Sequence, residues 1–125
     1  MNEQFTTLLS ILLNSSTQAQ VFHRQVTGPG SYSAHKALGT YYDEIIELVD
    51  SLTESYQGKY GIVINYKSYA LMDFISCEQV ISYFEELCNQ VYTLRTSVPD
   101  SYIQNQIDAI EELLYQTKYR LKFLA

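Results

Sequence analysis

The chain has 125 residues, with 14 acidic against 8 basic side chains and a formal net charge of −6 at pH 7. This length predicts a single domain over residues 1–125, and a hydrophobic content of 46% excludes a disordered chain. The acidic balance argues against DNA or RNA as a partner, because nucleic-acid binding requires a basic surface. The same balance suits a protein that attracts cations.

Neither a membrane span nor a secretory signal is expected. The longest apolar stretches, such as residues 8–13, are far shorter than the ~20 residues that cross a bilayer. If Cys77 and Cys88 share a helix, their Cα atoms lie ~16 Å apart along its axis, beyond the ~7 Å that a disulfide allows. We therefore expect both cysteines to be reduced core residues of a cytoplasmic protein, without a zinc site of the CxxC or HExxH type.

Apolar periodicity predicts a first helix from Glu3 to Val26 and a second from Tyr32 to Gln57. Residues 27–31 break the pattern with Gly-Pro-Gly, and either Ser31 or Ser33 is expected to cap the second helix. The core positions expected on these two helices are Phe5, Leu8, Leu9, Leu12, Ala19, Phe22, Leu38, Tyr41, Tyr42, Ile45, Leu48, Val49 and Leu52.

A third helix is predicted from Ser76 to Thr96, and a fourth begins near Pro99 and Asp100, with Pro99 in its first turn. Their expected core positions are Val80, Ile81, Phe84, Leu87, Cys88, Val91, Leu94, Ile103, Ile107, Ile110, Leu114, Leu121 and Leu124.

The stretch 58–75 is expected to connect the second and third helices. Residues 61–66 have strand-like composition but no partner strand, and a short helix is expected around 68–73. Two short connections and one long connection predict an all-α, ferritin-like four-helix bundle with a long crossover between helices two and three. A plain up-and-down bundle is the alternative, and it is less natural with a connection of this length.

Four polar residues stand out as candidates for a metal site. The short turn at 27–31 is expected to bring together the only two histidines, His23 and His35. Asp50 and Glu54 lie one turn apart on the second helix, where two carboxylates share a face and can share a cation. Taken singly, a lone histidine or an acid pair of this spacing is more often structural.

Taken together, residues 22–29 (FHRQVTGP), His35 and residues 50–54 (DSLTE) resemble the Dps branch of the ferritin-like proteins, the miniature ferritins of starved bacteria. The resemblance covers about residues 17–57, and the C-terminal half resembles the family only in its helical pattern. It implies Fe(II) oxidation by oxygen or peroxide and storage of Fe(III) in an oligomeric shell. The residues that it implies as metal ligands and as the site of catalysis are His23, His35, Asp50 and Glu54.

Two positions depart from the Dps pattern. Gly39 stands where the family usually has an acid, and Arg24 where it usually has tryptophan, so one metal position is expected to be weakened. The chain is also similar to small ferritin-like proteins of bacteriophages. The alternative function is therefore a structural or assembly protein of a phage particle, a virion component that contacts other virion proteins and keeps a degenerate site.

Geometry points to a site shared between subunits. His35 and Asp50 lie ~22 Å apart on one helix, and one metal ion with ligand bonds of ~2 Å cannot contact both. Antiparallel pairing of two second helices places His35 beside the partner's acids, and a twofold dimer then has two such sites. We therefore expect a homodimer or larger oligomer. Imidazole and carboxylate ligands suit iron, and zinc or manganese as substitutes.

Overall fold

The computed structural model describes residues 2–125, which form four α-helices and one short 3₁₀ helix. These elements are α1 (Glu3–Gln25), α2 (Ser31–Tyr60), α3 (Cys77–Leu94), η1 (Arg95–Ser97) and α4 (Ser101–Phe123). The prediction of an all-helical chain with four long helices is confirmed for the part of the chain that the structure describes. None of the helices within 2–125 is both long and apolar enough to cross a membrane.

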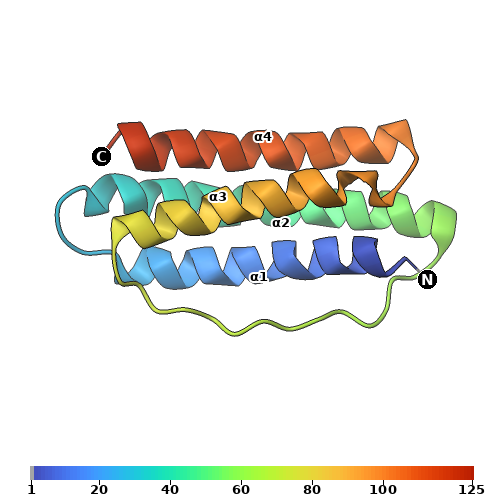
Figure 1. Ribbon diagram of the computed structural model, residues 1–125, viewed down its shortest axis with the longest axis horizontal. Helices are drawn as coiled ribbons and strands as arrows, with labels where there is room; N and C mark the ends of the chain where they lie inside the picture. Colours follow the sequence, from blue (N-terminus) through green and yellow to red (C-terminus); the bar gives the residue numbers. More distant parts are fainter. Residues whose placement is uncertain (1) are drawn as a thin grey trace.

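The four helices lie along one common axis (Figure 1). α1 and α4 run in one direction, and α2 and α3 run in the opposite direction. The main contacts of α1 are with α2 and α3, and α4 packs against the same two helices. α1 and α4 therefore form one diagonal of the bundle and α2 and α3 the other, so neighbouring helices are antiparallel.

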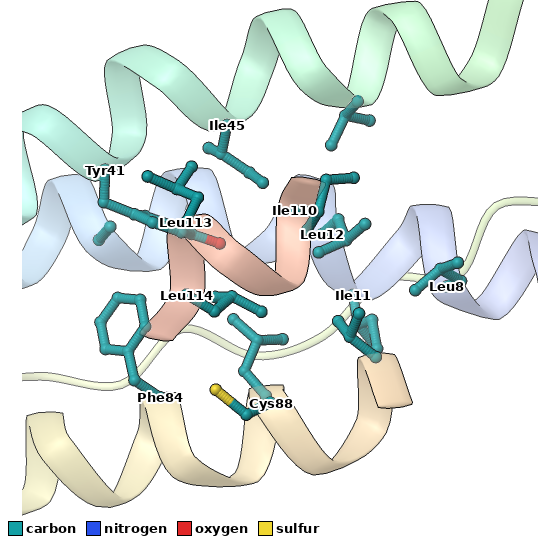
Figure 2. Close-up of a cluster of buried hydrophobic side chains, with 14 of the residues drawn as sticks. Leu8, Ile11, Leu12, Tyr41, Ile45, Phe84, Cys88, Ile110, Leu113 and Leu114 are labelled. Carbon is teal, nitrogen blue, oxygen red and sulfur yellow. The ribbon is translucent and has the colours of Figure 1, made fainter. Parts of the chain in front are cut away.

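The predicted apolar positions build the core. Figure 2 shows Leu12, Ile45, Cys88 and Leu114, one from each helix, directed toward the centre of the bundle. Of the predicted core positions, only Leu124 is exposed, because α4 ends at Phe123 and Leu124 lies beyond it. The expectation of two unpaired cysteines is also confirmed, since both lie in α3 and neither forms a disulfide.

The predicted start of the third helix at Ser76 is confirmed, since Ser76 caps α3, whereas the predicted starts of α2 and α4 need correction. α2 begins after Gly30, which has φ +78° and supplies no side-chain cap, so neither Ser31 nor Ser33 caps the helix. A left-handed conformation at this position favours glycine over serine. α2 also continues through Gly58 to Tyr60, beyond the predicted end at Gln57.

At the start of α4, Pro99 precedes the helix rather than occupying its first turn. Asp100 is the N-cap residue, but its carboxylate accepts hydrogen bonds from Lys59 and Tyr60 at the end of α2. The Lys59 ammonium, followed by the Tyr60 hydroxyl, lowers the pKa of Asp100 below its usual 3.8. This contact fastens the start of α4 to the end of α2.

Residues 61–76 connect α2 to α3 without helix or strand and pass alongside α1 for most of the bundle's length (Figure 1). The predicted short helix at 68–73 is wrong. Gln18 of α1 is fully buried, donates through Nε2 to the Met72 carbonyl (2.9 Å) and accepts the Met72 N–H at Oε1 (2.7 Å). Because Gln18 holds this amide, Met72 does not donate to the carbonyl four residues earlier, as a helix requires.

Two further α1 side chains bind the backbone of the same segment. The Lys67 N–H donates to Ser10 Oγ (2.9 Å), and the Phe74 N–H donates to Gln25 Oε1 (2.7 Å). Polar residues along α1 thus replace the internal hydrogen bonds that the segment lacks. The segment held in this way reaches the end of the bundle where α1 finishes, and α3 starts at that end (Figure 1).

We expect Gln18→Ala to lower the free energy of unfolding by about 1–3 kcal/mol, because it removes two hydrogen bonds to the Met72 backbone, each worth about 0.5–1.5 kcal/mol. Urea denaturation measures the change. Gln116→Ala is the matched control, since Gln116 is an exposed helical glutamine without a side-chain hydrogen bond in residues 2–125. Equal stability of the two variants would contradict a structural role for Gln18.

Candidate metal site

A tight turn joins α1 to α2. The N–H of Val26 closes α1 on the Phe22 carbonyl (2.9 Å), and the N–H of Ser31 bonds the Gly28 carbonyl (3.1 Å). Gly28 has φ +88° and Gly30 has φ +78°, a region that disfavours residues with a Cβ atom. The turn folds the last turn of α1 against the first turns of α2 (Figure 1).

This turn places the two histidines in direct contact, as their spacing predicted. The imidazoles of His23 and His35 stack with centroids 3.7 Å apart and planes 16° from parallel. Nδ1 of His23 lies 2.7 Å from the His35 carbonyl oxygen, and Nδ1 of His35 lies 2.8 Å from the His23 carbonyl oxygen. Each ring is therefore anchored to the backbone beside the other.

These two hydrogen bonds determine which ring nitrogen is available. A carbonyl oxygen only accepts, so each Nδ1 must carry a hydrogen and donate it. In the neutral imidazole, Nε2 then has the free lone pair, and neither Nε2 has a hydrogen-bond partner among residues 2–125. A histidine that donates Nδ1–H to a carbonyl and presents Nε2 has the arrangement typical of metal ligands.

The His35 ring also completes the end of α1. The His23 carbonyl belongs to the last turn of α1, where carbonyls lack a donor from the next turn of helix. His35 supplies that donor from α2. The pair thus contributes to the packing of the helix ends as well as presenting two nitrogens.

Gly39 makes the close approach of His23 possible. A Cβ atom at position 39 would lie 3.2 Å from Cε1 and 3.4 Å from Nδ1 of the His23 ring. Gly39 follows His35 by one helical turn, so its missing side chain leaves the gap through which His23 reaches the His35 carbonyl. The departure from the Dps pattern at this position therefore serves the histidine pair, a role that the spacing alone did not indicate.

Tyr42 is a third aromatic residue of the site, and sequence reasoning treated it only as a core position. Its ring meets the His23 ring edge to face, with centroids 5.3 Å apart and planes at 75°. Tyr42 follows His35 by seven residues, which is two helical turns, and this spacing could have predicted that both residues lie on the same face of α2.

Arg24, the other departure from the Dps pattern, is exposed. Its side chain forms no hydrogen bond or ion pair within residues 2–125.

The stacked arrangement favours one metal ion for each imidazole. A ligating nitrogen directs its lone pair in the plane of its ring. Two planes 16° from parallel, on rings 3.7 Å apart, do not meet within the ~2 Å length of a metal–nitrogen bond. The pair therefore offers one nitrogen to each of two neighbouring ions.

The structure does not bring the predicted carboxylates to the histidines of the same chain. Asp50 and Glu54 are exposed on α2, form no hydrogen bond or ion pair within residues 2–125, and begin ~22 Å along the helix from His35. No group of three or more metal-binding side chains occurs among the described residues. Within one chain, the four predicted residues thus lie at two separate places.

A family described as "Family of unknown function (DUF5856)" matches residues 28–121. The chain belongs to this family. The region matched to DUF5856 begins in the turn after α1, so it includes His35, Gly39, Asp50 and Glu54, whereas His23 lies before it. Comparisons with curated proteins and with solved structures give no match.

We expect Gly39→Ala to disturb the histidine pair, because the added methyl group requires the His23 ring to move by a few tenths of an ångström. Nitrogen-15 NMR of the imidazoles detects this as loss of the Nδ1–H form in one or both rings.

Gly58→Ala is the matched control, since Gly58 also lies in α2 and a Cβ there meets nothing within 4 Å. This control is expected to leave the imidazole signals unchanged and to raise stability by about 0.5–1 kcal/mol through helix propensity. Gly39→Ala is expected to raise stability by less than Gly58→Ala does, because its Cβ presses on the His23 ring. If Gly39→Ala leaves the imidazole signals unaltered and raises stability as much as Gly58→Ala does, then the close approach of His23 to Gly39 is not required.

Proposed function

We propose that this protein binds Fe(II), as its substrate, at sites shared between two copies of the chain and oxidises it to Fe(III) in the manner of Dps proteins. One observation carries the proposal. His23 and His35 donate Nδ1–H to each other's backbone, which leaves both Nε2 atoms available for metal, while within residues 2–125 no acidic side chain joins them in a metal-binding group.

The arrangement of the helices supports a ferritin-like identity. α2 and α3 run in the same direction and are joined by residues 61–76, which pass alongside the bundle (Figure 1). Ferritin-like bundles have one such long crossover, whereas plain up-and-down bundles have only short connections.

The surface of α2 supports twofold pairing. His35, Gly39, Tyr42, Ile46 and Asp50 follow one another at spacings of three or four residues and therefore share one face of the helix. Halfway between His35 and Asp50 lies Tyr42, and Ile46 beside it is 44% exposed. An antiparallel pair of α2 helices centred here buries these apolar side chains and places each His35 within a helical turn of the partner's Asp50 and Glu54.

Each residue has a defined part in the proposed chemistry. Each imidazole would bind one Fe(II), and the partner's Asp50 and Glu54 would supply carboxylate ligands that balance the charge of the ions. Every Fe(II) gives one electron to hydrogen peroxide or dioxygen, and the carboxylates stabilise the more highly charged Fe(III) that results. Zinc and manganese fit the same ligands. The proposal also includes storage of the oxidised iron in a shell and a cytoplasmic location. Both of these parts rest on the resemblance to Dps proteins.

A structural or assembly role, such as that of a virion component, is the second candidate. Gly39 favours it, because that position offers the His23 ring space rather than a further carboxylate. The two candidates differ in whether iron binds at all, and complementation between mutant subunits decides between them.

The experiment uses two variants, His23→Ala with His35→Ala and Asp50→Ala with Glu54→Ala. Each alone is expected to bind no iron at the shared sites, because every site needs histidines from one chain and acids from the other. After unfolding and refolding as an equal mixture, half of the dimers contain one chain of each kind and one intact site. Iron binding then recovers to roughly a quarter of the wild-type value, as twofold symmetry requires.

The control is Asp43→Ala with Glu47→Ala, which removes two exposed carboxylates of the same spacing from α2 and is expected to bind iron normally. Circular dichroism and size measurements first establish that all variants fold and dimerise. No recovery in the mixture would exclude the shared site. Normal iron binding by either ligand variant alone would leave the four residues structural and favour the assembly role.

A further inference from the structure

A second cluster of polar side chains lies where α2 begins and α4 ends. A surface pocket of about 290 Å³ is lined there by Ser33, Lys36, Ala37, Thr40, Arg120 and Leu124. Two of these residues are cationic, and no acidic side chain of residues 2–125 lines the pocket. This is unusual in a chain with a net charge of −6, in which acids outnumber bases.

Arg120 is the one arginine among the residues that line this pocket. Its Nη1 atom is buried and has no hydrogen-bond acceptor among residues 2–125, and its side chain forms no ion pair there. By contrast, Lys59, Arg95 and Lys122 are each paired with a carboxylate. A buried N–H group of a cation without an acceptor is costly, and such groups are normally satisfied. Because Nη1 itself is closed to solvent, the pocket meets other atoms of the Arg120 side chain, and no carboxylate within residues 2–125 balances its charge.

Two further donors face the same pocket from α2. Lys36 and Thr40 lie one turn apart on one helix face. The Lys36 ammonium has no carboxylate partner and lies 5.2 Å from the centre of the Tyr32 ring, and the Thr40 hydroxyl has no hydrogen-bond partner in the described residues. The Ser33 hydroxyl is already engaged, because it donates to the Leu124 carbonyl (2.5 Å). This bond holds Leu124, just beyond the end of α4, at the side of the pocket.

We infer that this pocket binds a phosphate group, either as inorganic phosphate or as the phosphate of a small phosphomonoester. The planar guanidinium matches the geometry of phosphate oxygens, and the ammonium of Lys36 balances a second negative charge. The Thr40 hydroxyl donates to a third oxygen. At ~30 Å³ for each water molecule, the pocket has room for a phosphate and a small attached group. The inference is independent of the iron proposal, because none of the four proposed metal ligands lines this pocket.

The test is a calorimetric titration of the metal-free, full-length protein with inorganic phosphate at constant ionic strength, with acetate as a separate arm. We expect saturable binding of one phosphate per chain and much weaker binding of acetate. Arg120→Gln is expected to weaken phosphate binding about tenfold or more, because hydrogen bonds to charged groups are among the stronger ones. Lys36→Gln and Thr40→Val, at exposed positions, are expected to weaken phosphate binding to a smaller extent. They replace Arg120→Gln as the test if that variant does not fold.

Arg24→Gln is the matched control, since it removes an exposed arginine without an ion pair near the same end of the bundle. It is expected to bind phosphate as the wild type does. An equal loss in Arg24→Gln and Arg120→Gln would show only general attraction of anions. That result, the absence of saturable phosphate binding, or acetate binding as strong as that of phosphate would overturn the assignment.

Discussion

The two hydrogen bonds between the Gln18 side chain and the Met72 backbone hold the connection on which the bundle's topology depends. They keep residues 61–76 extended beside α1, so that α3 starts at the end where α1 finishes and runs parallel to α2 (Figure 1). α4 then returns to that same end. The end of α4, and with it the Arg120 pocket, consequently lies at the end of the bundle where the short turn between α1 and α2 places the histidine pair.

Local patterns predicted most of the helical structure, because burial of an apolar stripe repeats every helical turn. Leu12, Ile45 and Leu114 are core residues for this reason. The same patterns failed at residues 68–73, where the decisive partner, Gln18, is 54 residues away from Met72 in sequence. Helix propensity describes bonds between near neighbours, and it contains no information on a distant buried amide that competes for the same N–H group.

The candidate site shows a similar division. The short turn with Gly28 and Gly30 was enough to predict that His23 and His35 meet. Their reciprocal bonds to backbone carbonyls were not predictable, because they depend on the gap at Gly39, which the family pattern presented only as a missing acid. The absence of a side chain at Gly39 thus removes an expected acid and also gives the His23 ring the space that its bond to the His35 carbonyl needs.

We propose that histidines and carboxylates from different copies of the chain meet at one metal centre. Crystals grown with Fe(II) under anaerobic conditions, and measured at the iron absorption edge, test it most directly. We predict anomalous peaks within ~2 Å of Nε2 of His23 or His35 in one copy and of an Asp50 or Glu54 oxygen in a twofold-related copy. Iron bound by ligands of one chain alone, or no peak at the imidazoles, would contradict the claim.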